Sequence, residues 1–204
     1  MSQLVPPPPW HLAGHAHLTI WRLDAQRLPA LPEGVRPATV RGQALVVTAF
    51  VDYSEEGVLA YHELLAGVVA RRGRGLALTI TDIWVDDEVS QAGGRELWGI
   101  PKRLARFDLL VATDDDGPIG FAAFVPYRLV RSPTVRLPRL SGTVAQTLAG
   151  ATVATPVRAT GRARLERSEW TFPSTAALGW LRPATALVSL SVPRFQMTFG
   201  TDPG

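Results

Sequence analysis

Residues 93–104 read Gly-Gly-Arg-Glu-Leu-Trp-Gly-Ile-Pro-Lys-Arg-Leu, and Lys102 within them is the only lysine in the chain. Since lysine and arginine together number 21, the other 20 are arginine. A primary amine can lose its proton near neutral pH and attack a carbonyl group, whereas a guanidinium stays charged. Lys102 is therefore a candidate nucleophile. The alternative is a solvated surface lysine in a chain that otherwise uses arginine.

The flanks of Lys102 favour burial of its amine. Apolar residues surround it, namely Trp98, Ile100, Pro101 and Leu104. Burial among apolar groups disfavours a charged amine, so the sequence predicts a lowered pKa for Lys102. Consecutive residues of an extended backbone point to opposite faces, so we expect burial, not repulsion from Arg103, to be the main cause.

Composition predicts one globular domain. The chain has 204 residues, of which 46% are hydrophobic and 19% charged, and this is enough apolar material for a substantial core. The proline-rich residues 1–14 are expected to form an extended N-terminal arm. Residues 15–204 are expected to form the single domain.

Several classes of protein are excluded or disfavoured. The absence of cysteine excludes disulfides and thiolate catalysis. No apolar run approaches the roughly 18 residues of a membrane span, so we expect a soluble, cytoplasmic protein without a membrane partner. The net charge is only +3, and no aromatic residues interleave with the arginines, which disfavours nucleic-acid binding. Phosphate-loop and nucleophile-elbow motifs are missing, and no cofactor is expected.

Two groups of polar residues could suggest a metal ion. His15 and His17 share one face of a predicted strand, but no third ligand occurs at a useful spacing, so half-buried histidines are favoured. The acidic residues 114–116 precede Gly-Pro and are flanked by predicted strands, which is typical of a hairpin tip. No metal site is expected.

Hydrophobic alternation predicts a chain made mainly of strands. An antiparallel meander is expected over residues 43–85, preceded by a strand at His15–Leu23. Further strands are expected at Ala105–Thr113, at Ile119–Tyr127, twice within Val135–Arg167, and at Ala186–Phe199. Short helices are expected after Asp24 through Leu31 and within Ser174–Trp180, with a helix or loop at Asp86–Gln91. The fold class is thus mainly β, or β-rich α+β.

Glu63 is a second candidate, because it is a carboxylate inside an otherwise apolar strand. Buried carboxylates are rare unless they are paired or functional. Since side chains alternate along a strand, Tyr61, Glu63 and Leu65 share one face. If that face points inward, Glu63 enters the core or a cavity.

With these residues in hand, the chain resembles the acetoacetate decarboxylase family. Gly94-Arg95-Glu96-Leu97 followed by Pro101-Lys102-Arg103-Leu104 is similar to the family's Gly-Arg-Glu-Leu and Pro-Lys-Lys-Leu signature at the same spacing. Tyr61-His62-Glu63 resembles its Tyr-x-Glu, and Val192-Pro193-Arg194 resembles its last Leu-Pro-Arg strand. The resemblance covers most of the chain from about residue 15.

The resemblance implies an antiparallel β-barrel or cone with a few short helices, assembled into homo-oligomers. It implies a Schiff-base lysine at Lys102 and a carboxylate of the site at Glu63. Other residues of the matched motifs are expected to line or support the pocket, namely Tyr61, Arg95, Glu96, Trp98 and Arg103. The implied activity is that of a lyase that decarboxylates a small β-keto acid such as acetoacetate.

Two departures from the family pattern leave the reaction open. The family's early-strand arginine, which meets the substrate carboxylate, falls near Gly14, and its second glutamate falls at Thr48 or a neighbour. Substitutes for that arginine could be Arg22, Arg41 or Arg95. The alternatives are therefore an aldolase-dehydratase that acts on oxo acids through the same imine, and a non-catalytic barrel that binds small molecules.

Overall fold

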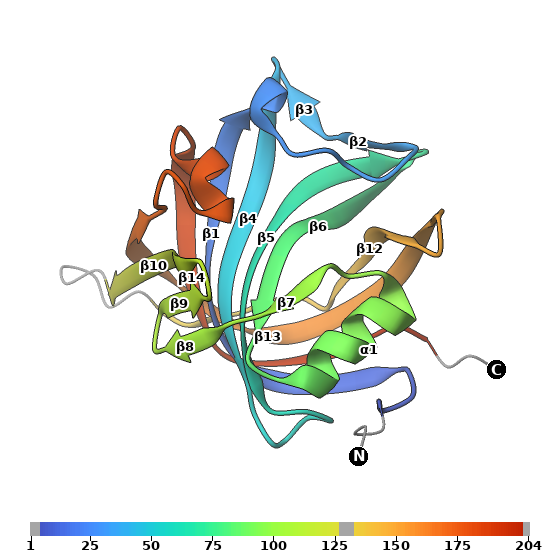
Figure 1. Ribbon diagram of the computed structural model, residues 1–204. Coiled ribbons are helices and arrows are strands. Elements are labelled where there is room, and N and C mark those ends of the chain that lie inside the picture. Colours follow the sequence, from blue (N-terminus) through green and yellow to red (C-terminus); the bar gives the residue numbers. More distant parts are fainter. Residues whose placement is uncertain (1–4, 127–132, 202–204) are drawn as a thin grey trace.

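Strands make up nearly all of the fold. The computed structural model describes residues 5–126 and 133–201. In chain order its elements are β1 (Trp10–Asp24), η1 (Ala25–Arg27), β2 (Val35–Pro37), β3 (Thr39–Val40), β4 (Gln43–Tyr53), β5 (Tyr61–Arg72), β6 (Gly75–Val85), α1 (Glu88–Trp98), β7 (Lys102–Leu104), β8 (Arg106–Asp108), β9 (Val111–Asp114), β10 (Gly117–Pro126), β11 (Val135–Arg136), β12 (Leu140–Leu148), β13 (Ala151–Thr171), η2 (Ala177–Leu181) and β14 (Thr185–Phe199) (Figure 1).

One sheet closes on itself. Its strands follow the order β12, β6, β5, β4, β1, β14 and β13, and β12 also pairs with β13, which completes a ring (Figure 1). Most pairings are antiparallel, but β12 meets β6 in parallel at Val144 and Leu78, and β7 runs parallel to β6. The predicted mainly β fold is confirmed, and the meander over residues 43–85 corresponds to β4, β5 and β6.

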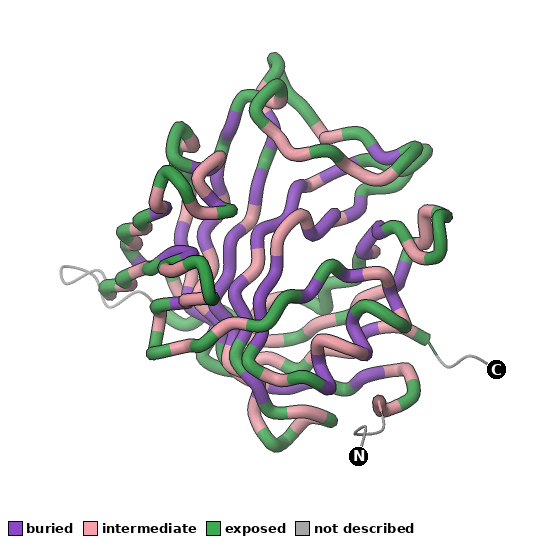
Figure 2. The backbone as a smooth tube through the Cα atoms, viewed as in Figure 1, coloured by how far each residue is buried: buried purple, intermediate pink, exposed green. Residues whose placement is uncertain are grey.

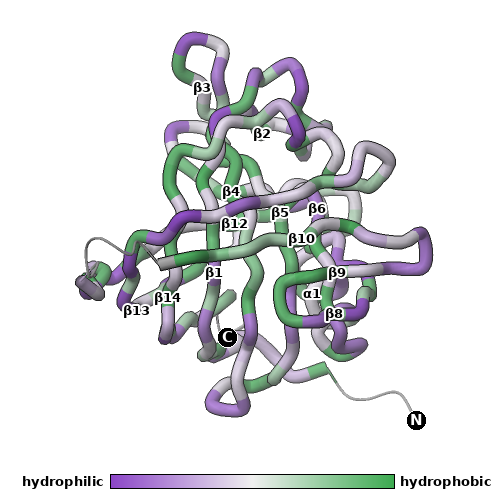
Figure 3. The backbone as a smooth tube through the Cα atoms, turned by 90° about the vertical axis from the view of Figure 1, so that its left-hand side faces the viewer, coloured by the Kyte–Doolittle hydropathy of each residue, from purple (hydrophilic) through white to green (hydrophobic). Residues whose placement is uncertain are grey.

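The long central strands are buried on both faces. On β5, Tyr61 and Leu65 belong to the core inside the ring, whereas Leu64 and Ala66 belong to a second core that β8 to β10 and η2 cover. Burial on both sides explains why β5 is apolar at every position from Leu64 to Ala70. Buried residues run along β4, β5 and β6 in Figure 2, and hydrophilic residues gather at the turns in Figure 3.

The first strand begins earlier than the alternation indicated. β1 starts at Trp10, which is 1% exposed and pairs with Phe199 of β14. The indole Nε1 of Trp10 donates to the Pro6 carbonyl oxygen at 2.9 Å. The predicted boundary between an arm (1–14) and the domain therefore falls inside β1. Residues 1–4 of that arm lie outside the described residues.

Helix α1 is longer than predicted, because the sequence indicated at most a short helix or loop at residues 86–91. The helix runs on through Gly93 and Gly94, two poor helix formers. A Cβ added at Gly93 would clash with Trp10, and one added at Gly94 would clash with Lys102. The helix ends at Gly99, which adopts the left-handed conformation (φ 67°) that favours glycine. α1 lies against β6, β7 and β12 (Figure 1).

Three other boundaries differ from the expectation. The strand predicted at Ala105–Thr113 is two short strands, β8 and β9, joined by a turn in which Leu109 has a positive φ of 52°. The helix after Asp24 is only the single turn η1, capped by the Asp24 carboxylate. Residues 135–167 contribute to three strands, not two. Tyr127, the expected end of a strand, lies outside the described residues.

Candidate active site

The backbone around Lys102 is fixed by both ends of α1. At the helix start, the Asp87 carboxylate accepts a hydrogen bond from the Ser90 N–H at 2.6 Å, as an N-cap does. At its end, the Ile100 N–H donates to the Gly94 carbonyl oxygen at 2.9 Å, and the chain turns into β7. Because of this turn, the side chain of Lys102 lies along Gly94 and reaches back towards Ser90.

The Lys102 ammonium group is buried and has three partners. Its Nζ lies 3.0 Å from Glu63 Oε2 and donates hydrogen bonds to Ser90 Oγ at 2.8 Å and to Tyr61 Oη at 3.2 Å. Lys102 is 4% exposed and Glu63 3%. An ammonium group has three N–H donors, so this set satisfies all of them. A buried charge requires such pairing.

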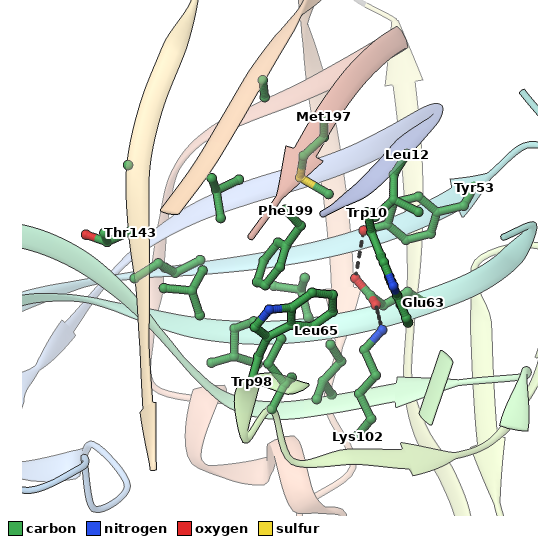
Figure 4. A pocket seen from close by; sticks show the side chains of 18 of the residues that line it. Trp10, Leu12, Tyr53, Glu63, Leu65, Trp98, Lys102, Thr143, Met197 and Phe199 are labelled. Carbon is green, nitrogen blue, oxygen red and sulfur yellow. Dashed lines mark hydrogen bonds and ion pairs between the residues drawn. The ribbon is translucent and has the colours of Figure 1, made fainter. Parts of the chain in front are cut away.

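Glu63 is held by a second tyrosine. The Tyr53 hydroxyl donates to Glu63 Oε1 at 3.1 Å, on the oxygen that Lys102 does not meet (Figure 4). Tyr53 and Tyr61 face each other across β4 and β5, with ring centroids 4.4 Å apart. The two carboxylate oxygens of Glu63 are thus oriented separately, one by a phenol and one by the amine.

The amine opens onto a cavity inside the ring. The cavity has a volume of about 340 Å³, and Lys102 and Glu63 are the only charged side chains that line it among the described residues. Trp98 lies in its wall between Trp10 and Phe199, with ring centroids 4.8 Å and 4.7 Å away (Figure 4). An apolar pocket with a few convergent polar groups is the usual form of a small-molecule site.

The pKa of Lys102 differs from the prediction. Burial disfavours the charged amine, but the Glu63 carboxylate and the Tyr61 hydroxyl outweigh burial, and together they raise the pKa of Lys102 above its usual value. The expected lowering is therefore wrong, because the apolar flanks of Lys102 did not reveal its carboxylate partner. Burial also raises the pKa of Tyr61 to about 12, so this phenol stays neutral at physiological pH.

The predicted supporting residues divide into two groups. Tyr61 and Trp98 line the cavity. Arg95 lies outside it and donates from Nε to the Lys102 carbonyl oxygen at 2.7 Å, which fixes the backbone of β7. Arg103 points to the opposite face, where it pairs with Asp82 and stacks on Trp84, as the alternation predicted. Glu96 is exposed on α1 and does not line the cavity.

No arginine lines the cavity among the described residues. Gly14 packs so closely on β4 that an added Cβ would meet the carbonyl oxygen of Asp52, so no side chain fits there. Thr48 lies in the second core, where it accepts a hydrogen bond from the Trp21 indole. The suggested substitutes, Arg22 and Arg41, are exposed. Among the described residues, the cavity therefore has no cation other than Lys102 that could meet a substrate carboxylate.

Sequence reasoning missed Ser90, Tyr53 and Trp10. The register of β4 and β5 could have identified Tyr53, because it lies directly opposite Tyr61 across a short connection and shares the inward face. Ser90 carries no such signal. Its approach to Lys102 depends on the turn that returns β7 beneath α1.

The histidines considered for a metal site pair with carboxylates instead. His17 Nδ1 lies 3.1 Å from Glu166, and His15 Nε2 lies 3.5 Å from Asp52. Burial lowers the pKa of His17, although Glu166 opposes this effect. Within the part of the chain that the structure describes, no three acidic or histidine side chains are arranged to hold a metal ion. Nor is any described helix long and apolar enough to cross a membrane.

Comparison with known proteins decides the family. The family profile described as acetoacetate decarboxylase (ADC) matches residues 1–171. The chain belongs to the acetoacetate decarboxylase family. It is 33% identical over 134 residues to the acetoacetate decarboxylase of Chromobacterium violaceum, a match that covers 59% of this chain and 51% of the relative. The enzyme of Paraburkholderia phytofirmans is 38% identical over 81 residues, which cover 37% of this chain and 29% of the relative.

Solved structures of other proteins share the fold. Acetoacetate decarboxylase from Legionella pneumophila aligns with a TM-score of 0.72 at 15% identity, covering 98% of this chain and 88% of that one. The enduracididine biosynthesis enzyme MppR, solved with pyruvate, aligns with a TM-score of 0.65 at 17% identity, and the alignment covers 97% of this chain and 90% of MppR. The chain spans about half the length of the curated relatives it matches.

Gly94 allows a test of how closely the lysine is positioned. An added Cβ there would lie 2.7 Å from Lys102 Cδ, so Gly94→Ala should displace the lysine side chain while improving helix propensity. A misplacement of about 1 Å can cost on the order of 10²-fold in rate. Given the imine at Lys102 that is proposed below, we expect Gly94→Ala to slow borohydride trapping of that imine by about this factor, and to lower the urea midpoint less than a clash with a rigid ring would.

Gly93→Ala is the matched control. Its added Cβ would meet the rigid ring of Trp10 at 2.5 Å, so this variant should lose stability. Equal trapping rates for Gly94→Ala and the unmodified protein would contradict the tight packing of Lys102 on Gly94.

Proposed function

We propose that this chain is a lyase that forms a Schiff base between Lys102 and a carbonyl substrate and decarboxylates a β-keto acid. The observation that carries the proposal is the buried Lys102 amine, which contacts Glu63, Tyr61 and Ser90 at the inner end of an apolar cavity. Membership of the acetoacetate decarboxylase family supports the reaction class.

The reaction starts with a proton transfer. Lys102 is stored as an ammonium, and Glu63 Oε2, 3.0 Å from Nζ, can accept the proton that must leave before attack. The neutral amine then adds to the ketone carbon, and loss of water gives a protonated imine. The ammonium donates to both Tyr61 and Ser90, and the protonated imine keeps one N–H, which either hydroxyl can accept.

The imine supplies the electron sink for bond cleavage. When the bond to the carboxyl group breaks, its electron pair moves to the imine nitrogen, carbon dioxide leaves, and an enamine results. Glu63 gives back its first proton when water leaves the carbinolamine, and we propose that it then takes up a second proton from solvent and delivers it to the enamine carbon. This restores a protonated imine, and water releases the ketone product. The low polarity of the cavity favours the step, because the carboxylate charge disappears on cleavage.

A second candidate is aldol condensation and dehydration through the same imine. The cavity has room beyond Lys102 for a second carbonyl compound, which is the observation in favour. The MppR enzyme has been solved with the condensation product of pyruvate and imidazole 4-carboxaldehyde. Release of carbon dioxide from a β-keto acid, measured against condensation of pyruvate with an aldehyde, separates the two reactions.

Borohydride reduction tests the imine directly. Because Lys102 is the only lysine, the N-terminus is the only other amine that could form an adduct in this chain. We expect incubation with acetoacetate or pyruvate, followed by reduction, to add the substrate mass to the peptide that contains Lys102. A protein that gives no adduct with any small oxo acid would be the non-catalytic binding barrel. Homo-oligomeric assembly and a cytoplasmic location stay predictions.

A further inference from the structure

The charges in the cavity restrict what the rest of a substrate can be. Lys102 and Glu63 neutralise each other at 3.0 Å, and no further charged side chain lines the cavity among the described residues. A charged group placed in the enclosed part of the cavity, away from Lys102, would therefore be buried without a partner among these residues, which costs several kcal/mol or more. Along the enclosed part of the cavity formed by the described residues, only uncharged substrate groups fit beyond the amine.

The cavity extends from a buried end to an exposed end. Lys102 and Glu63 are almost wholly buried, whereas Leu140 on β12 is half exposed and Gly142 beside it is exposed. In Figure 4, Lys102 and Thr143 lie on opposite sides of the cavity, with the Phe199 and Trp98 rings between them. A substrate held at Lys102 thus points its remaining atoms along apolar walls towards β12.

The cavity is larger than a small oxo acid. Its volume is about 340 Å³. A water-sized group occupies about 30 Å³, so the space suits on the order of ten non-hydrogen atoms. Acetoacetate has seven non-hydrogen atoms, so it would leave about a third of this space empty and part of the apolar wall without contacts, and such contacts supply affinity in a site of this kind.

We propose that the substrate is a carbonyl compound with an uncharged, apolar chain or ring that extends from the carbonyl carbon to Gly142, and that Gly142 sets its greatest length. This inference rests on the proposed imine at Lys102, which fixes the reactive end of the substrate. It assigns a medium-chain or aryl 3-oxo acid, in preference to acetoacetate, as the class that the cavity favours.

Gly142 is suited to this role by its place on β12. Alternation puts it on the same face as Val144, which is buried in the core inside the ring. A Cβ added to Gly142 would meet no other heavy atom within 4 Å, so space is open in the direction of its missing side chain. Larger side chains at this position should therefore shorten the cavity without a backbone clash.

A series of unbranched methyl ketones tests the chain preference. Binding is measured by the fluorescence of the tryptophans, two of which, Trp10 and Trp98, line the cavity, and imine formation by borohydride trapping at Lys102. Each added methylene should tighten binding roughly four-fold until the chain reaches Gly142. Affinity that does not depend on chain length would overturn the inference, even if adducts form. Length-dependent binding without any adduct would instead overturn the proposed imine.

Two variants, Gly142→Leu and Gly142→Ala, test whether Gly142 limits the chain length of the substrate. Both should weaken binding of the longest ketones, Gly142→Leu by about ten-fold or more and Gly142→Ala by less, with short ketones unaffected. Thr147→Leu is the control, because Thr147 is exposed on the same strand and does not line the cavity. If both glycine variants lose affinity equally at every chain length, or if neither loses affinity, Gly142 does not limit the chain length.

Discussion

Replacing Lys102 with methionine is expected to abolish imine trapping and to lower turnover by at least about 10⁴-fold, the loss typical of removing a catalytic nucleophile. Methionine fills a similar volume but has no amine, and no other lysine exists in the chain to substitute for it. Borohydride adducts and carbon dioxide release from a 3-oxo acid measure the effect. Residual turnover within ten-fold of the unmodified protein would contradict a covalent role for Lys102.

A double variant separates lost chemistry from lost folding. Lys102→Met alone leaves the Glu63 carboxylate buried without its cation, and breaking a buried ion pair in this way costs about 3–5 kcal/mol of unfolding free energy. Adding Glu63→Gln removes the second charge, and the amide can still accept the Tyr53 hydrogen bond. We expect urea unfolding to show that the double variant recovers most of this stability, although it remains inactive.

Glu63→Gln alone should move the pH dependence of Lys102. In the unmodified protein the Glu63 carboxylate outweighs burial and raises the pKa of Lys102, so the neutral amine is scarce at pH 7 and trapping should accelerate into the alkaline range. Without Glu63, burial remains and the pKa of Lys102 falls. The rate of imine trapping in the variant should therefore reach its plateau at lower pH, although turnover is lost with the proton carrier.

The same shift predicts the sign of a stability change. Because the pKa of Lys102 is raised on folding, its pairing stabilises the protein fully below the unfolded pKa of about 10.5, and this contribution disappears as pH rises through the folded value. Glu63→Gln should lack this alkaline loss. Asp82→Asn is the matched control, since it breaks the Arg103 ion pair on the opposite face and should leave the trapping profile unchanged.

Local patterns were enough to single out Lys102 and Glu63, which form an ion pair beside the cavity. A single lysine among apolar residues and a carboxylate in an apolar strand both reflect the rule that charges enter a core only with a partner or a purpose. Alternation also placed Tyr61 and Glu63 on one face and Arg103 opposite Lys102, because the two-residue period of a strand is a local property.

Contacts between distant segments account for what the sequence did not reveal. Gly93 and Gly94 are poor helix formers, yet they lie within α1. Trp10 from β1 and Lys102 from β7 occupy the space where side chains at these two positions would be. Trp10 packs on Gly93, and β1 therefore begins at Trp10 and not at the predicted His15. Such packing depends on how the sheet closes, which the spacing of residues along the chain does not encode.

The sequence by itself determined the family, the mainly β fold, and the residues Lys102 and Glu63, because each rests on a motif or on local periodicity. Only the tertiary structure decided the protonation state of Lys102 beside Glu63 and the shape of the cavity around them. Lys102 is held as an ammonium by Glu63, Tyr61 and Ser90, because strands and a helix far apart in the chain converge on it. That convergence reverses the pKa shift that burial alone would cause.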